Sequence, residues 1–137
     1  TYTDLVLVAA PKQVSGTAQL ICRFNSDTGS NYSFTRAGGD GSSTGALSVS
    51  NFSYIQLSWF GYIEANNNQI TTINFNSYAN TNIKKTTLSR SNNTSNGVGT
   101  ICGLWNSTAA ITSITLLPDA GSFATGSTFT LYGITAA

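Results

Sequence analysis

Short segments in which apolar and polar residues alternate recur along the whole chain, and they restrict its fold more than any other feature. In QITTINFNSY, residues 69–78, one face would carry Thr71, Ile73 and Phe75, with asparagines pointing the other way. A period of two residues is typical of a strand that is buried on one side. No stretch keeps apolar residues at the i, i+3, i+4 spacing of a helix over three turns.

Thr, Val, Ile and aromatic residues dominate these segments, and Gly, Asn and Ser separate them. About nine short strands at such spacing predict an all-β chain, a sandwich or barrel with mostly antiparallel pairing. No domain boundary stands out, so we expect one domain over residues 1–137. The expected strands are 4–10, 17–25, 31–36, 52–60, 69–79, 83–90, 98–105, 110–117 and 127–134.

Charge is scarce. Only 8% of the 137 residues are charged, against about 25% in an ordinary domain. Thr, Ser and Asn together supply 52 residues, so hydroxyls and amides keep the surface wet. A net charge of +1 attracts neither nucleic acid nor an anionic membrane, and no apolar run approaches the roughly 18 residues of a membrane span. We therefore expect neither nucleic acid nor membrane as a partner.

Two Gly- and Ser-rich stretches contain aspartate: NSDTGSN at 25–31 and GGDGSSTG at 38–45. A calcium loop needs several oxygen ligands at regular spacing, and each stretch offers one carboxylate. A phosphate loop needs a lysine after its glycines, which is missing here. Asp, Gly and Asn are also the residues of tight turns. Both stretches are predicted to be turns, and we expect no metal or other cofactor.

Candidate catalytic groups are few. The chain has no His, which removes the commonest general base and the usual zinc ligands. The acids are scattered, and we expect no enzymatic activity; a hydrolase acting on surface glycans would have to use Asp27, Asp40 and Glu64. Lys84, Lys85 and Arg90 form one basic cluster. It is interpreted as a set of charges that protect an exposed strand from edge pairing, with nucleic-acid binding as the alternative.

The two cysteines, Cys22 and Cys102, lie in apolar segments. Their spacing does not decide between two small buried side chains and a disulfide, and the first is favoured.

Trp59, Phe60 and Tyr62 precede an asparagine-rich segment, Asn66 to Asn68. Aromatic rings beside amides are typical of sugar recognition, because a ring stacks on the sugar while amides bond its hydroxyls. Trp59 could instead fill the core, which is the favoured interpretation, or lie in a subunit interface. The candidate glycan or partner contacts are Trp59, Tyr62, Asn66, Asn67 and Asn68.

Four segments together resemble a known family: YTDLVLVAA at 2–10, RFNSDTGSNYSFT at 23–35, GLWNSTAAITSITLL at 103–117 and, most specifically, GSTFTLYGI at 126–134. The family comprises small surface proteins of tailed-bacteriophage virions, which decorate capsids or form head fibres and tail-fibre tips. The resemblance covers most of the chain and is weakest over residues 54–70. Cys22, Cys102 and the SWFGYI segment depart from the family pattern.

The resemblance implies a jelly-roll-like β-sandwich, located in the virion and assembled as a homotrimer. The expected function is that of a structural capsid decoration, cement or head-fibre protein bound to the major capsid protein or to a fibre or tail protein. The alternative is a receptor-binding fibre tip that recognises a host surface glycan. It implies no catalytic residues. Strand 127–134 is the candidate for burial near the trimer axis, through Phe129, Leu131 and Tyr132.

Overall fold

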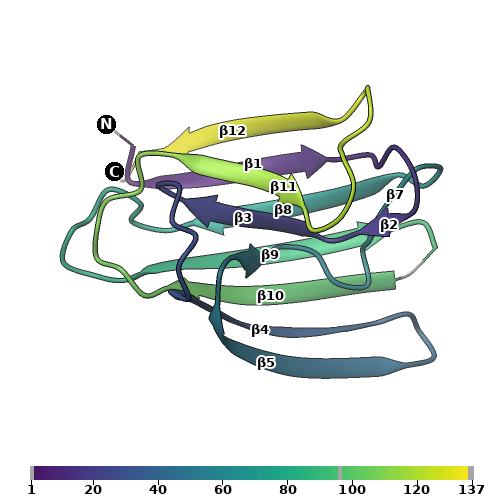
Figure 1. Ribbon diagram of the computed structural model, residues 1–137, viewed down its shortest axis with the longest axis horizontal. Coiled ribbons are helices and arrows are strands. Elements are labelled where there is room, and N and C mark those ends of the chain that lie inside the picture. The colour runs from purple at the N-terminus through teal and green to yellow at the C-terminus, as the bar shows by residue number, and fades with distance from the viewer. Residues whose placement is uncertain (1, 96, 136–137) are drawn as a thin grey trace.

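The computed structural model describes residues 2–95 and 97–135, and within them every strand pairing is antiparallel and no helix occurs. The predicted all-β class is confirmed, with twelve strands rather than about nine (Figure 1). The strands are β1 (Asp4–Ala10), β2 (Thr17–Ala18), β3 (Leu20–Phe24), β4 (Tyr32–Gly39), β5 (Thr44–Phe52), β6 (Ile55–Gln56), β7 (Ile63–Glu64), β8 (Gln69–Phe75), β9 (Lys85–Asn93), β10 (Gly97–Trp105), β11 (Ile114–Pro118) and β12 (Thr128–Ile134).

The strands form two unequal layers. One sheet has seven strands in the order β12-β1-β8-β9-β10-β4-β5, and a smaller sheet has the order β11-β3-β6. Figure 1 shows the smaller sheet in front of the larger one, with β4 and β5 extending beyond it. Strands β2 and β7 form a separate pair. The first and last strands of the chain pair with each other, so both chain ends lie at one side of the molecule.

The core lies between the two layers, and the period of two decides which residues enter it. Thr71, Ile73 and Phe75 of β8 are buried, as the alternation predicted. Strand β9 alternates between buried and exposed residues over its full length. The core cluster consists of Leu7, Ala9, Leu20, Cys22, Phe24, Tyr32, Ile55, Leu57, Ile63, Ile73, Phe75, Trp105 and Ile111.

The prediction of a strand over 52–60 was wrong. The chain forms β6 over two residues only and then a loop, 57–62, that crosses the inner face of β9 and β10. Ser91 holds the loop, because its hydroxyl oxygen accepts from the Trp59 N–H (3.2 Å) and its hydroxyl donates to the Trp59 carbonyl (3.3 Å). At Phe60, φ is +57°, a conformation that is costly for a bulky residue. An apolar sequence here covers a sheet without joining one.

Strand β5 was missed, because residues 37–51 resemble a loop in composition. Its inward positions are Gly45, Leu47 and Val49, with small polar or alanine residues between them. The alternation was therefore present, but weak. Gly45 lies against the ring of Trp59: a Cβ at Gly45 would stand 2.9 Å from Trp59 Cη2. Gly45 makes the strand hard to recognise in the sequence, and its missing side chain leaves room for the Trp59 ring.

The interpretation of the basic cluster as edge protection was also wrong. Strand β9 is the fourth of seven strands, so it has neighbours on both sides. Lys85 lies on its inner side with no exposed surface, and its Nζ donates to the carbonyl oxygens of Ile83 (2.7 Å) and Thr108 (3.1 Å). Burial lowers the pKa of Lys85. This lysine ties the 106–113 loop to the sheet.

Candidate functional site

The turn around Asp27 is a structural device. The Asp27 Oδ1 accepts the N–H of Gly29 (2.8 Å), and its Oδ2 accepts the indole N–H of Trp105 (2.8 Å). The bond from Trp105, helped by Gly29 and Asn31, holds the pKa of Asp27 below its usual value. Trp105 is buried and lies in the core cluster. The predicted turn is confirmed, and its carboxylate anchors a core ring.

The second aspartate turn joins β4 to β5. The Asp40 Oδ1 accepts the N–H groups of Ser43 (2.6 Å) and Ser42 (2.9 Å) together with the Ser42 hydroxyl (3.0 Å). These bonds lower the pKa of Asp40. Both predicted turns thus use their aspartates to bond backbone. Within residues 2–95 and 97–135, no group of three or more His, Cys, Asp or Glu side chains could hold a metal ion.

Trp59 is half-buried and lies outside the core cluster. Its ring packs edge-on against Phe60 (4.7 Å between centroids), and the Arg36 guanidinium lies 4.6 Å from its centroid. Gly45 of β5 meets its edge. Trp59 therefore bridges the loop and the β4–β5 hairpin, and the favoured expectation that it fills the core was wrong.

The other predicted contact residues have different neighbours. Asn67 Nδ2 donates to Glu64 Oε2, and Asn67 Oδ1 accepts from the Thr94 hydroxyl (3.3 Å). The Tyr62 carbonyl accepts from Asn93 Nδ2 (3.0 Å). Asn66 and Asn68 are exposed in the loop between β7 and β8. The ring of Trp59 thus lies at the β4–β5 side, while the side chain of Asn67 joins Glu64 of β7 to the turn between β9 and β10.

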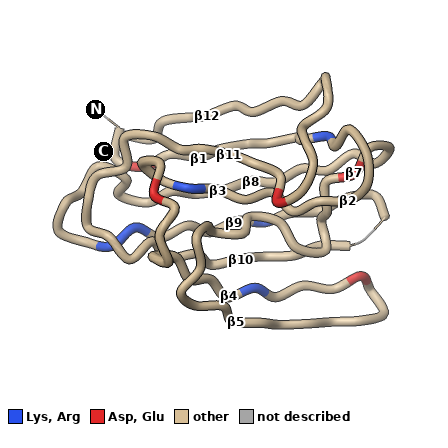
Figure 2. The backbone as a smooth tube through the Cα atoms, in the orientation of Figure 1, with Lys and Arg blue, Asp and Glu red and all other residues tan. Residues whose placement is uncertain are grey.

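Strand β12 ends the seven-stranded sheet and is exposed along its whole length. Its register with β1 places Phe129 and Leu131 on the inner face and Tyr132 on the outer face. Leu131 and Tyr132 are 53% and 54% exposed. Phe129 meets Phe123 of the segment between β11 and β12, at 5.1 Å between ring centroids. The strand carries no charged residue (Figure 2).

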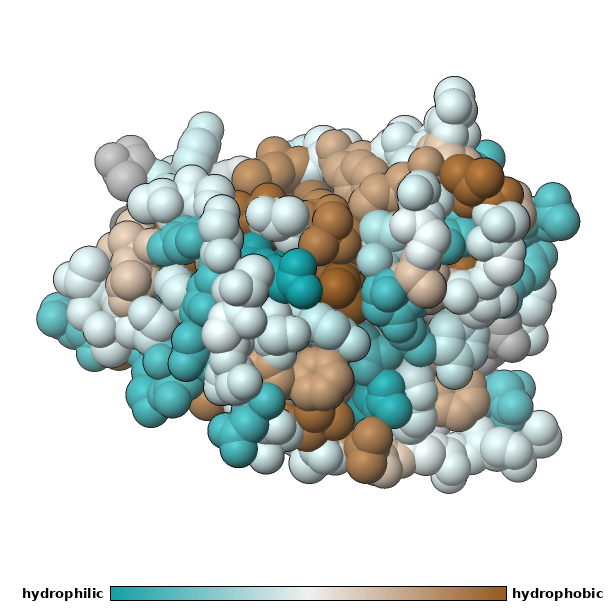
Figure 3. Space-filling model, in the orientation of Figure 1, coloured by the Kyte–Doolittle hydropathy of each residue, from teal (hydrophilic) through white to brown (hydrophobic). Residues whose placement is uncertain are grey.

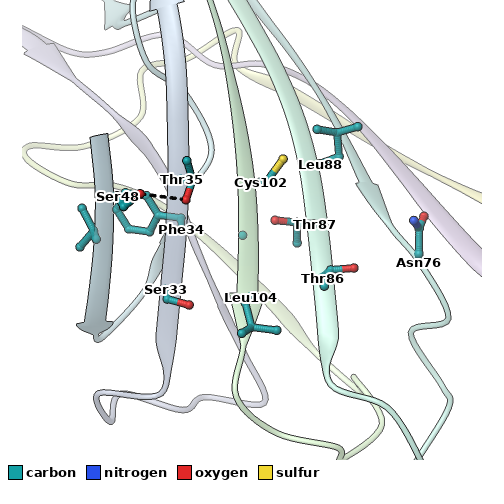
Figure 4. Close-up of a pocket in the computed structure, with 12 residues that line it drawn as sticks. Ser33, Phe34, Thr35, Ser48, Asn76, Thr86, Thr87, Leu88, Cys102 and Leu104 are labelled. Atoms are coloured by element: carbon teal, nitrogen blue, oxygen red, sulfur yellow. Dashed lines mark hydrogen bonds between the residues drawn. The ribbon is translucent and has the colours of Figure 1, made fainter. Parts of the chain in front are cut away.

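The outer face of the large sheet is open. A shallow depression of about 630 Å³ crosses β9, β10, β4 and β5, and Figure 4 shows Thr35, Cys102 and Leu104 among the side chains over it. Leu88 of β9 is 50% exposed there. The side chains lining the depression carry apolar, hydroxyl, thiol or amide groups, and none is charged. A face of this kind suits contact with another uncharged surface.

The cysteines do not form a disulfide. Cys22 is buried in the core, and burial raises its pKa. Cys102 is exposed on the outer face, so the expectation of two buried thiols was wrong for Cys102. The alternation around Cys102 did not indicate which face of its strand is covered by the second layer.

Comparison with protein-family models, with curated proteins and with solved structures finds no match to this chain. In the described part of the chain no helix is long and apolar enough to cross a membrane.

Proposed function

We propose that this chain is a structural subunit of a bacteriophage virion surface, a capsid decoration, cement or head-fibre protein that assembles as a homotrimer. The observation that carries the proposal is strand β12. Both of its faces present large apolar side chains, with Phe129 and Leu131 on one and Tyr132 and Ile134 on the other. Strands that are apolar on both faces are typical of positions buried on both sides.

A free edge of this kind is unusual in a monomer. Proteins protect edge strands with charges, prolines or bulges, because unpaired backbone groups recruit other chains. Strand β12 has no charge and no proline, and its register with β1 is regular over seven residue pairs. Packing of three β12 strands around an axis would bury these side chains. The sequence resemblance to virion surface proteins supports the same assembly.

The open outer face supplies a second surface for neighbours in the particle. It is wide and nearly free of charge, and it carries exposed apolar side chains such as Ile70, Leu88 and Val98. Protein–protein interfaces use such faces, because charged residues are depleted at the centre of an interface. The major capsid protein or a fibre protein is the proposed occupant.

The mass of the purified protein tests the assembly. Light scattering should give three times the 14.4 kDa mass of the chain, and Leu131→Asp should give folded monomers. Leu47→Asp is the matched control, since Leu47 is 47% exposed on the other edge strand, and it should leave the mass unchanged. A monomeric wild-type protein would overturn the assembly.

The second candidate is a receptor-binding fibre tip. Sedimentation of labelled protein with undecorated phage heads, and separately with host cell envelopes, distinguishes the two. Binding to heads supports the decoration role, whereas binding to envelopes alone refutes it and supports the tip. In the structure Trp59 is engaged by Arg36 and Phe60. A glycan site at Trp59, Tyr62 and Asn66 to Asn68 therefore has less support than the sequence indicated.

A further inference from the structure

A cleft of about 250 Å³ separates the small sheet from the β4–β5 hairpin. It lies at the end of the large sheet that is opposite to β12. Figure 3 views this side of the molecule and shows brown and teal side chains next to one another along the boundary. The cleft is lined by Gln19, Ile21, Phe34, Arg36, Val49, Phe52, Tyr54, Gln56 and Asp119.

Arg36 forms one side of the cleft and is held in place. Its Nη1 donates to Gln56 Oε1 (2.5 Å), and its guanidinium stacks on Trp59. Its Nε is buried, and no protein group in the described residues accepts from it. A buried donor without a partner is unfavourable unless water or a ligand satisfies it. The guanidinium is therefore fixed by its neighbours and still has hydrogen-bonding capacity.

Asp119 supplies the opposite charge. Its Oδ1 accepts the backbone N–H of Gln19 (2.8 Å), which fixes the carboxylate at the end of β11. Tyr54 lies within the influence of both charges: burial and Asp119 raise the pKa of its hydroxyl, while Arg23 and Arg36 lower it. A carboxylate, a guanidinium and a phenol thus converge on one small space.

The remaining wall is aromatic. Phe52 and Tyr54 meet edge to face at 4.7 Å between centroids, and Phe34 meets Phe52 in the same way at 5.9 Å. Phe52 is 36% exposed, so part of its ring is open to a ligand. The cleft therefore combines ring surface with polar groups that are fixed in direction.

We propose that this cleft binds one neutral pyranose residue of a glycan. Adjacent hydroxyls of a sugar pair with planar groups such as a guanidinium, a carboxylate and an amide, and its apolar face packs on aromatic rings. Asp119 disfavours an anion and Arg36 a cation, while an apolar ligand would leave the Arg36 Nε without an acceptor. The volume is below the roughly 300 Å³ of a drug-sized site, which suits a single ring.

Titration with methyl pyranosides of glucose, galactose, mannose and N-acetylglucosamine, followed by amide NMR shifts, tests the site. We expect at least one sugar to bind with a Kd of about 1 mM and to shift residues of the cleft. Methyl glucuronide, which adds a carboxylate, should bind more weakly than methyl glucoside. The proposal is overturned if no sugar shifts the cleft, if the shifts lie around Asn66 to Asn68 instead, or if the glucuronide binds more tightly than every neutral sugar.

Two variants assign the binding to the cleft. Asp119→Asn retains an oxygen for the Gln19 N–H and removes the charge, and Tyr54→Ala removes one ring. Each should weaken binding by about tenfold, which corresponds to one good hydrogen bond or ring contact. Tyr132→Ala on β12 is the control and should leave the affinity unchanged. Unchanged affinity in both cleft variants would refute the proposal. Because the cleft and β12 are at opposite edges, sugar binding and the oligomer mass can fail independently.

Discussion

Strands β5 and β12 end the large sheet, so each has a neighbouring strand on one side only. The two strands differ in how far the rest of the chain covers them. Each has a glycine on its inner face that is covered by an aromatic ring, Gly45 by Trp59 and Gly133 by Tyr2. On β5 the covering ring is clamped by Arg36, and the register with β4 shifts between Tyr32 and Phe34. Strand β12 has neither feature.

The difference shows how one chain can protect one edge strand and leave the other open to a partner. Irregular pairing and a covering loop protect a sheet edge from other chains. Rings of the 57–62 loop cover the inner face of β5 at Gly45, whereas β12 presents apolar side chains on both faces. Strand β5 ends the sheet with protection from the loop and the irregular register, whereas β12 is the strand that the proposed assembly would cover. This contrast can be tested at each edge separately.

Removal of the two covering rings should have the largest effect. Trp59→Ala should lower the free energy of unfolding by ~2 kcal/mol, about half of the value for a fully buried Trp, because Trp59 is half-buried. That corresponds to a fall in Tm of roughly 8 °C. Tyr2→Ala should cost only about 0.5 kcal/mol, since Tyr2 is 54% exposed. Urea unfolding at one fixed protein concentration measures both.

Trp59→Phe is the control for that experiment and should recover part of the loss. Equal losses for Trp59→Ala and Tyr2→Ala would show that the β5 edge is not clamped, and the contrast between the edges would be wrong.

Filling the two glycines should have the next largest effect. Gly45→Ala places a Cβ 2.9 Å from Trp59 Cη2, and Gly133→Ala places one against the ring of Tyr2. We expect Gly45→Ala to cost about 1–2 kcal/mol, because the clamped Trp59 cannot move away. Tyr2 can turn outward, so Gly133→Ala should be nearly neutral. A larger cost at Gly133 in the same urea measurements would contradict this order.

A change of pH should have the smallest of the three effects, and it should act at the turn before β5. Hydrogen bonds from Ser43 and Ser42 hold the pKa of Asp40 below its ordinary value of 3.8. A lowered pKa in the folded state means that the ionised carboxylate stabilises the turn above that ordinary value. This contribution is lost as the pH falls through the pKa of the folded state. No carboxylate lies on β12.

An NMR titration from about pH 5 to pH 2 should therefore move the amide signals of the turn before β5, and it should leave unchanged those of Thr128 to Thr130, which lie at the end of β12 far from the pairing of Ile134 with Asp4. Asp40→Asn should abolish the movement. A carboxyl signal of Asp40 that titrates at or above its ordinary value would refute the bonding pattern.

Some of the site could not be read from local patterns. The cleft is built from Gln19, Arg36, Tyr54 and Asp119, which lie far apart in the sequence and come together only where the small sheet meets the β4–β5 hairpin. The asparagine segment was predicted to be a contact site because its amides are adjacent in the chain. Residues that are adjacent in the sequence need not line the same cleft, and Asn66 to Asn68 do not line this one.

The sequence by itself determined the strands with strong alternation and the aspartate turns. Strand β1 begins and ends where it was predicted, and Thr71, Ile73 and Phe75 face the core. Asp27 and Asp40 bond their own turns. These features depend on side-chain direction and on backbone bonds within a few residues, so a local pattern contains them.

Only the tertiary structure decided which alternating face is covered. Lys85 is buried, Cys102 is exposed, and the apolar segment 57–62 is a loop over the sheet. Each outcome depends on which strand lies beside or above the residue, and that partner is distant along the chain. Alternation with a period of two residues shows that a strand has two different faces. Only the packing of the layers selects the face that is buried.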